Sequence, residues 1–129
     1  MSGAWSPEEL AAIARTDDLH IAVLHEDGAS YGTLTWIWSV VVEHNLYVRA
    51  YHGQNSRWYQ SALREKVGKI TAAGLTKEVT LEPVSGVIND LIDDSYRAKY
   101  GDSPYLAPMI GAGPRSATVK ITPGDAAAR

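Results

Sequence analysis

The segment between residues 33 and 51 constrains the fold most strongly, because its pattern is that of two consecutive β-strands. Along residues 33–43 every second side chain, from Leu34 to Val42, is apolar, and these side chains share one face of the strand. The other face is partly apolar. His44 and Asn45 then supply a two-residue turn, and residues 46–51 alternate again. Strands joined by so short a turn pair antiparallel. Because both of its faces are partly apolar, strand 33–43 is predicted to be central, or to lie between a barrel interior and a partner surface.

The rest of the chain predicts a small α+β barrel. Ser6 is placed to cap a helix, with Pro7 at the first helical position and Glu9 completing a capping box. We expect helices over residues 7–15, 57–66 and 86–100, and further strands over residues 19–24, 69–73, 75–83 and 117–122. About six mainly antiparallel strands with two to three flanking helices make a single domain of 129 residues. Residues 1–18 hold its N-terminal helix, and residues 124–129 form a frayed tail.

The composition excludes several classes of function. There is no Cys, so a disulfide scaffold, a thiolate metal site and a cysteine nucleophile are ruled out. The four His residues form no His-x-x-x-His or Glu-x-x-His pair, and we therefore expect no metal site. A formal net charge of −3 argues against nucleic acid as a partner, and no apolar run approaches the length of a membrane span. With no signal-peptide pattern at the N-terminus, we expect a soluble cytoplasmic protein.

Positive charge gathers in the middle of this acidic chain. Residues 46–77 contain six basic side chains and one acidic side chain, which gives a local charge of +5 against −8 for the remainder. Such a separation favours a defined anionic ligand over bulk nucleic acid. The alternative is that these basic side chains form an ordinary solvated surface.

The most informative part of this basic segment is a strand–loop–helix step. The strand over residues 46–51 carries Arg49, and Gly53 lies in the loop that follows this strand. Ser56 and Arg57 open the next helix, whose N-terminal N–H groups suit a phosphate or a carboxylate. Ser56 could instead cap the helix with its own side chain. Trp58 either packs in the core or stacks on a flat ring.

Two further pairs of residues complete the candidate site. Trp36 and Trp38 share one face of strand 33–43, where they line a pocket for a planar ligand, pack in a dimer interface or anchor the core. Tyr51 and His52 follow Arg49 along the chain and are the candidate acid/base residues. For His52 the alternatives are a haem ligand and a plain loop residue.

Several motifs occur together in an order and spacing that resembles a known bacterial family. They are Leu46-Tyr47-Val48-Arg49, Gly53, Trp58-Tyr59, Ile92-Asp93-x-x-Tyr96-Arg97-x-Lys99-Tyr100 and Ala117-Thr118-Val119. Across residues 21–123 the chain resembles the family known as domain of unknown function 2255. That family is similar in turn to the split β-barrel flavin-binding group, which includes pyridoxamine-phosphate-oxidase-like proteins and deazaflavin-dependent nitroreductases.

The resemblance implies a split β-barrel that forms a homodimer, with cofactor sites at the subunit interface. It implies that the flavin phosphate is held by Arg49, Ser56 and Arg57, with Lys69 and Thr71 as weaker candidates. The loop of residues 54–57 lacks the Lys and Pro that are usual in the deazaflavin enzymes, and this departure argues against a deazaflavin.

Three functions are consistent with these residues. The first is a flavin-dependent, nitroreductase-like oxidoreductase for a small organic substrate, with FMN as cofactor and Trp36, Trp38 or Trp58 beside its ring. The second is a cofactor-free protein that binds a small anionic metabolite. The third is a cofactor-independent enzyme that uses His52 or Tyr51. Deazaflavin and haem are the alternative cofactors.

Overall fold

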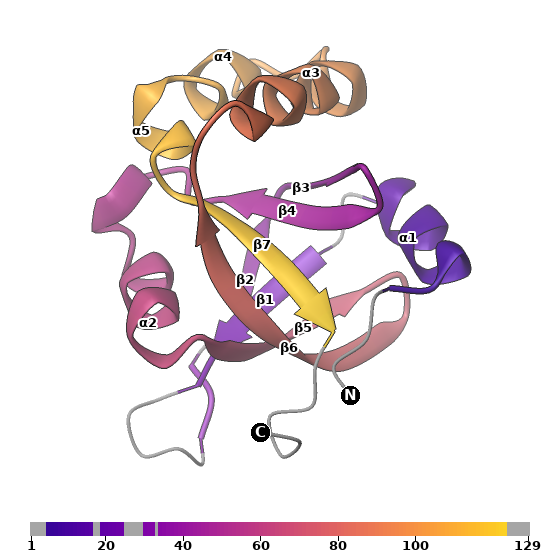
Figure 1. Cartoon of the computed structure of the whole chain (residues 1–129), viewed down its shortest axis with the longest axis vertical. Coiled ribbons are helices and arrows are strands. Elements are labelled where there is room, and N and C mark those ends of the chain that lie inside the picture. The colour runs from indigo at the N-terminus through magenta and orange to yellow at the C-terminus, as the bar shows by residue number, and fades with distance from the viewer. Residues whose placement is uncertain (1–4, 17–18, 25–29, 33, 124–129) are drawn as a thin grey trace.

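The computed structural model describes residues 5–16, 19–24, 30–32 and 34–123, and its centre is a single antiparallel sheet of seven strands. In the order in which they neighbour one another, the strands are β2 (Thr35–Ile37), β1 (Leu19–Val23), β5 (Val67–Ala72), β6 (Leu75–Val84), β7 (Thr118–Pro123), β4 (Asn45–Arg49) and β3 (Ser39–Val42). The sheet curls into a nearly closed barrel (Figure 1). The predicted α+β barrel of mainly antiparallel strands is therefore confirmed.

Helices cover the barrel at three places. They are α1 (Pro7–Ala14), the short 3-10 helix η1 (Gly53–Asn55), α2 (Arg57–Glu65), α3 (Ile88–Tyr100), α4 (Leu106–Met109) and α5 (Ala112–Arg115). Figure 1 shows α3, α4 and α5 together over one end of the sheet, with α1 and α2 on opposite sides of it. Among the described residues no helix has the length and apolar character that a membrane crossing requires. The predicted tail, residues 124–129, lies outside the described residues.

The capping box at the start of α1 is confirmed. The Ser6 hydroxyl accepts a hydrogen bond from the Glu9 backbone N–H, and the Glu9 carboxylate accepts one from the Ser6 backbone N–H. These two bonds satisfy donors that a helix N-terminus otherwise leaves unpaired. The helix ends at Ala14, one residue before the predicted end.

The prediction of one strand over residues 33–43 is wrong in one respect, because the segment forms two strands. β2 pairs with β1, whereas β3 pairs with β4, and these two pairings lie at opposite ends of the strand order. The chain crosses from one edge to the other at Trp38, which belongs to neither strand. This crossing nearly closes the barrel, and it raises the number of strands from about six to seven. It also interrupts the alternation, so that Trp36 is 53% exposed and Trp38 only 8%.

The prediction of a central strand is wrong, because β2 and β3 lie at the two ends of the strand order. Both faces of β3 and β4 are nevertheless largely buried. One hydrophobic cluster fills the barrel interior and includes Leu46 and Val48. A second cluster lies between the outer face of these strands and the C-terminal helices, and it consists of Trp38, Val40, Val42, Tyr47, Ile92, Tyr96, Tyr100 and Met109. The outer face is therefore covered by α3 and α4 of the same chain.

Candidate functional site

A cavity of about 610 Å³ opens beside the crossing between β2 and β3. Its lining consists of Trp36, Ile37, Trp38, Arg49, Tyr51, Tyr100, Ser103, Tyr105 and Met109. These residues come from the crossing, the end of β4, the C-terminal end of α3 and the segment that leads through α4. The volume lies in the range of small-molecule sites. Because five of the nine lining residues are Trp or Tyr, we call it the aromatic cavity.

Some aromatic side chains of this cavity are buried and stacked on each other, and the others are exposed to solvent. The Trp38 indole stacks on the Tyr100 ring with centroids 4.0 Å apart and planes 1° from parallel. Both residues are buried, so their rings form a rigid surface. Trp36 and Tyr105 are more than half exposed, and Tyr105 meets Tyr51 edge to face with centroids 6.1 Å apart. A flat ligand can contact these exposed rings without displacing core side chains.

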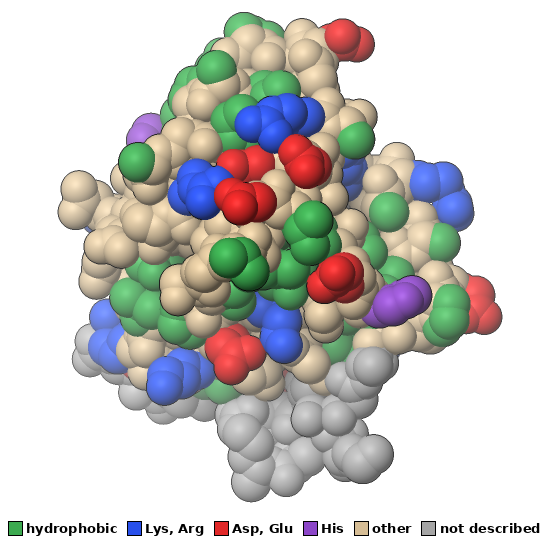
Figure 2. All heavy atoms as spheres, turned by 45° about the horizontal axis from the view of Figure 1, so that its top comes forward, with side chains coloured by type: hydrophobic (Ala, Val, Ile, Leu, Met, Phe, Trp, Pro, Cys, Tyr) green, Lys and Arg blue, Asp and Glu red, His purple; other side chains and the backbone are tan. Residues whose placement is uncertain are grey.

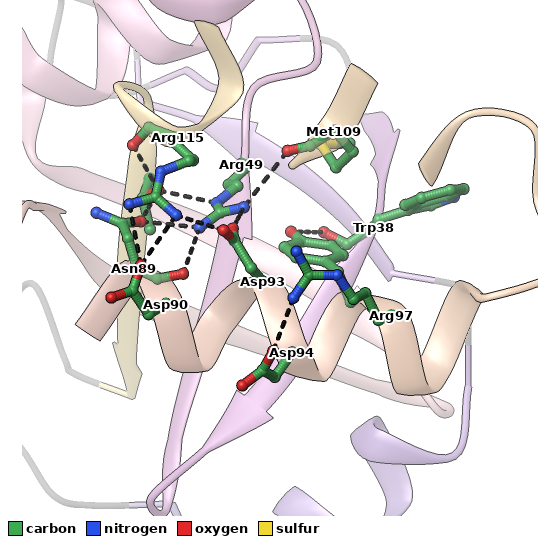
Figure 3. Close-up of polar contacts among 11 residues, drawn as sticks. Trp38, Arg49, Asn89, Asp90, Asp93, Asp94, Arg97, Met109 and Arg115 are labelled. Carbon is green, nitrogen blue, oxygen red and sulfur yellow. Dashed lines mark hydrogen bonds and ion pairs between the residues drawn. The ribbon is translucent and has the colours of Figure 1, made fainter. Parts of the chain in front are cut away.

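Arg49 reaches the cavity but is wholly occupied by other groups of the protein. Its Nε donates to Thr118 Oγ1 at 3.1 Å. Nη1 donates to Asp93 Oδ1 at 2.5 Å and to the Met109 carbonyl at 3.4 Å, and Nη2 donates to the carbonyl and Oδ1 of Asn89 at 3.2 and 2.9 Å. Arg has five N–H donors, so these bonds use all of them. Figure 3 shows the guanidinium enclosed by these partners.

Asp93 is the centre of this network. Its second carboxylate oxygen accepts a hydrogen bond from Arg115, whose guanidinium also lies 3.3 Å from Asp90. By sequence alone, the i, i+4 spacing of Asp93 and Arg97 predicts a supporting pair on the helix and favours a solvated helix face for Asp93, and the structure contradicts both predictions. Asp93 is buried and pairs with Arg49, whereas Arg97 pairs with Asp94 at 2.7 Å. The cause is tertiary, because the fold places β4 beside the first turns of α3.

The network joins segments that are distant in sequence. Arg49 comes from β4, Asp93 and Tyr96 from α3, and Thr118 from β7. The Tyr96 ring lies 5.3 Å from the Arg49 guanidinium carbon, and complete burial raises the pKa of the Tyr96 hydroxyl above its usual value. These four residues belong to three of the motifs that carry the family resemblance. The motifs therefore meet at one place, where they hold α3 against the barrel.

Apart from Arg49, the residues of the predicted phosphate-binding step do not line the aromatic cavity. Gly53 is buried in η1 with a φ of +73°, a value that favours glycine. Ser56 occupies the N-cap position of α2, and its side chain makes no capping hydrogen bond. Arg57 is exposed at the first position of this helix. None of the three is among the residues that line the aromatic cavity.

Trp58 and Lys69 also lie away from the aromatic cavity. Trp58 is half-buried and packs against the hydrophobic cluster of the barrel interior. Lys69 lies on β5 with its ammonium 4.7 Å from the Tyr31 ring centroid, and β6 and β7 separate β5 from the strand that carries Arg49. Thr71, on the same strand as Lys69, has its hydroxyl 3.2 Å from that of Thr76. Neither Trp58 nor Lys69 is among the lining residues.

The two candidate acid/base residues take different positions. Tyr51 lines the aromatic cavity and is 39% exposed. The His52 ring meets Tyr51 edge to face at 5.3 Å but is not among the lining residues. Among the described residues no group of three or more His, Asp or Glu side chains is placed to hold a metal ion.

Sequence reasoning found four of the nine lining residues: Trp36, Trp38, Arg49 and Tyr51. It missed Ser103, Tyr105 and Met109, which lie in the segment that leads from α3 through α4. It quoted Tyr100 as part of a motif, without a role in binding. One sequence signal points to this lining: the chain has no Phe, so all of its aromatic side chains, four Trp and seven Tyr, carry a polar N–H or O–H group.

Charges of both signs are interspersed near this end of the molecule. Figure 2 shows Lys and Arg side chains beside Asp and Glu side chains over the upper helices, which agrees with the Arg97–Asp94 and Arg115–Asp90 pairs. The basic excess of residues 46–77 is partly paired as well, because Arg64 contacts Glu65 and Lys77 contacts Glu9. The excess of basic side chains in residues 46–77 therefore does not form a single basic surface at the cavity.

Comparison with known proteins places the chain in a family and confirms its fold. Residues 9–121 match the family described as "Uncharacterized protein conserved in bacteria (DUF2255)". A similar solved structure is that of a conserved hypothetical protein, Rv2991, from Mycobacterium tuberculosis, with a TM-score of 0.63 and 15% sequence identity. The match covers 92% of this chain and 79% of that chain. No curated protein matches the chain.

Proposed function

We propose that this chain, which belongs to that family of uncharacterised bacterial proteins, binds a small molecule with a flat aromatic ring in the aromatic cavity. The observation that carries the proposal is the lining, in which Trp36, Tyr51 and Tyr105 are exposed around a rigid pair of stacked rings. Exposed aromatic side chains that converge on one cavity are costly to leave in water, and they favour stacking with a planar ligand.

The redox form of this proposal is a flavin-dependent, nitroreductase-like oxidoreductase. The residues fit the ring of a flavin or deazaflavin, because Trp36 and Tyr51 offer faces and edges around a volume of about 610 Å³. The bound cofactor would supply the hydride chemistry, while the chain would orient its ring and exclude water. Arg49 does not fit a phosphate, since all its donors are used within the protein.

Spectroscopy on the purified protein tests both forms of the proposal. FMN, a deazaflavin and haem are each added, and the absorbance spectrum and the quenching of intrinsic fluorescence are followed, because four Trp residues report on ring binding. We expect saturable quenching with a flavin or deazaflavin. If none of the three compounds changes the spectrum or the fluorescence, the proposal is wrong. A protein-dependent shift of the Soret band on addition of haem, with no response to FMN or the deazaflavin, would reassign the cofactor.

A cofactor-independent enzyme on the same cavity is the second candidate. The observation that favours it is Tyr51, whose ring is part of the lining while its neighbour His52 contacts it at 5.3 Å. A phenol beside an imidazole can transfer a proton to a bound substrate. This candidate predicts turnover in protein that holds no cofactor, and loss of that turnover in His52→Ala and Tyr51→Phe.

A homodimer remains part of the proposal. Trp36 is 53% exposed and Tyr105 is 59% exposed at the cavity, and contact with a second copy of the chain would cover these side chains. The molar mass in solution, measured by light scattering for the wild-type chain and for Trp36→Ala, is the test. A wild-type mass of 14.0 kDa at micromolar concentration would contradict a stable dimer.

A further inference from the structure

A second cleft, of about 590 Å³, opens at the C-terminal end of α3. It is lined by Arg97, Ala98, Lys99, Tyr100, Gly101, Asp102 and Ser103. Tyr100 and Ser103 also line the aromatic cavity, so the two spaces are neighbours that share these residues. A ligand that passes Ser103 would extend from the aromatic cavity into this second space, which we call the α3 cleft.

The two spaces differ in chemistry. The aromatic cavity is lined mainly by rings, and its one charged side chain, Arg49, is paired with Asp93. The α3 cleft presents the charged side chains of Arg97, Lys99 and Asp102 together with the Ser103 hydroxyl. A ligand that fills both spaces needs a flat ring at one end and a polar chain at the other.

Arg97 is better placed than Arg49 to receive an anionic group at the end of such a chain. Arg49 is fully buried, and withdrawing it from Asp93 would leave a buried carboxylate without its partner. Arg97 is 54% exposed and its partner Asp94 is 70% exposed. An exposed ion pair of this kind contributes little, so a phosphate that binds the guanidinium through two hydrogen bonds can replace Asp94. Figure 3 shows Arg97 and Asp94 set apart from the Arg49 network.

Lys99 has a different role in the cleft, because its ammonium is held in place. Its Nζ donates to the Ser39 carbonyl at 2.8 Å and to the Ile13 carbonyl at 3.4 Å. The same ammonium lies 5.3 Å from the Tyr100 ring centroid, beside the boundary between the two spaces. Its position is set by carbonyl groups of β3 and α1, whereas the Arg97 side chain is exposed and able to reorient toward a ligand.

We propose that the ligand of this protein has two parts: a flat ring in the aromatic cavity and a polar chain in the α3 cleft, whose anionic end binds Arg97. This inference rests on the proposed function, because it assumes that a ring occupies the aromatic cavity. It differs from what the family resemblance implies, since it locates the phosphate or carboxylate at the end of α3 rather than at Arg49, Ser56 and Arg57.

Three flavins with the same ring test the proposal. Lumiflavin carries no chain, riboflavin carries a hydroxylated chain, and FMN adds a phosphate to that chain. Their dissociation constants are measured with wild-type protein, Arg97→Ala and Arg57→Ala; the last is a matched removal of an exposed Arg outside the cleft. We expect wild-type protein to bind FMN about tenfold more tightly than riboflavin, since charge-assisted bonds to phosphate are strong. Arg97→Ala should reduce this ratio to about one, and Arg57→Ala should leave it unchanged.

Asp94→Ala provides a second variant that acts in the opposite direction. It removes the carboxylate that competes for Arg97, so the preference for FMN over riboflavin should be retained or should rise. Because both side chains are exposed, neither Arg97→Ala nor Asp94→Ala is expected to impair folding, and circular dichroism checks this.

Each outcome decides between the possibilities. Equal binding of FMN and riboflavin by the wild-type chain would overturn the proposal, as would a preference for FMN that disappears in Arg57→Ala but persists in Arg97→Ala. If lumiflavin and riboflavin bind but FMN gains nothing, the proposed function stands and the two-part ligand fails. If no flavin binds, the proposed flavin site itself is wrong, and the two-part ligand falls with it.

Discussion

Substituting Asp93 by Ala should destabilise the protein strongly, because Asp93 is the carboxylate that compensates Arg49. Arg49 has no exposed surface, and Asp93 Oδ1 lies 2.5 Å from its Nη1. Removing one partner of a buried ion pair costs about 3–5 kcal/mol. With 129 residues, the unfolding entropy at the melting temperature is about 0.27 kcal/mol per kelvin. The melting temperature should therefore fall by about 11–18 °C.

Thermal and denaturant unfolding of the wild-type chain, Asp93→Ala and Asp94→Ala test this value. Asp94 is one residue away on the same helix and forms an exposed pair with Arg97, so its removal should cost no more than about 1 kcal/mol. If Asp93→Ala is within about 1 kcal/mol of Asp94→Ala, the buried network does not hold α3 on the barrel, and the reasoning is refuted.

Three further predictions concern pH and backbone packing. The Lys77 ammonium and the Ser6 backbone N–H lower the pKa of Glu9 below its usual 4.5, so the stabilisation that Glu9 provides should be complete above about pH 4.5 and be lost as the pH falls through the lowered pKa. In Glu9→Gln the denaturation midpoint should therefore depend less steeply on pH in this acidic range than in the wild-type chain. Equal slopes for the two proteins would contradict this prediction. Burial raises the pKa of Tyr47 and Tyr59 above 10.0, so these side chains should stay protonated in the folded chain slightly above pH 10. Denaturation at that pH should therefore increase the phenolate absorbance. A Cβ at Gly101 would lie 2.6 Å from the Arg97 carbonyl oxygen; Gly101→Ala should therefore cost about 1–3 kcal/mol, while Gly113→Ala, with nothing within 4 Å, should be nearly neutral in denaturant unfolding.

Local patterns in the sequence were sufficient to predict most of the secondary structure. The Ser6–Glu9 capping box predicted the start of α1, and the short turn after strand 33–43 predicted the β3–β4 pairing. The turn itself was predicted one residue too late, because it is formed by Glu43 and His44, both with positive φ, and Asn45 already pairs with Val42. Such signals depend on neighbouring residues only, and the fold did not override them. The break at Trp38 has no such signal, because it arises from the pairing of β2 and β3 with strands at opposite edges of the sheet.

The candidate site was harder to predict, because side-chain partners are set by tertiary structure. Arg49, predicted as a phosphate ligand, does line the cavity, yet it is not a free cation, and nothing in the sequence indicates that Asp93 and Asn89 surround it. An i, i+4 spacing suggested Arg97 as the partner of Asp93, and the approach of β4 to α3 replaced that local pair. Tyr105 was missed for a related reason: its segment shows no periodicity that marks it as part of a lining.

The binding of lumiflavin to the wild-type chain and to Trp36→Ala is the most direct test of the central claim, that the aromatic cavity holds a flat ring. Leu91→Ala is the matched control, because Leu91 is also exposed and apolar but is not part of the lining. We predict saturable binding that Trp36→Ala weakens about tenfold and that Leu91→Ala leaves unchanged. No binding by the wild-type chain, or equal binding by the wild-type chain and Trp36→Ala, would contradict the claim.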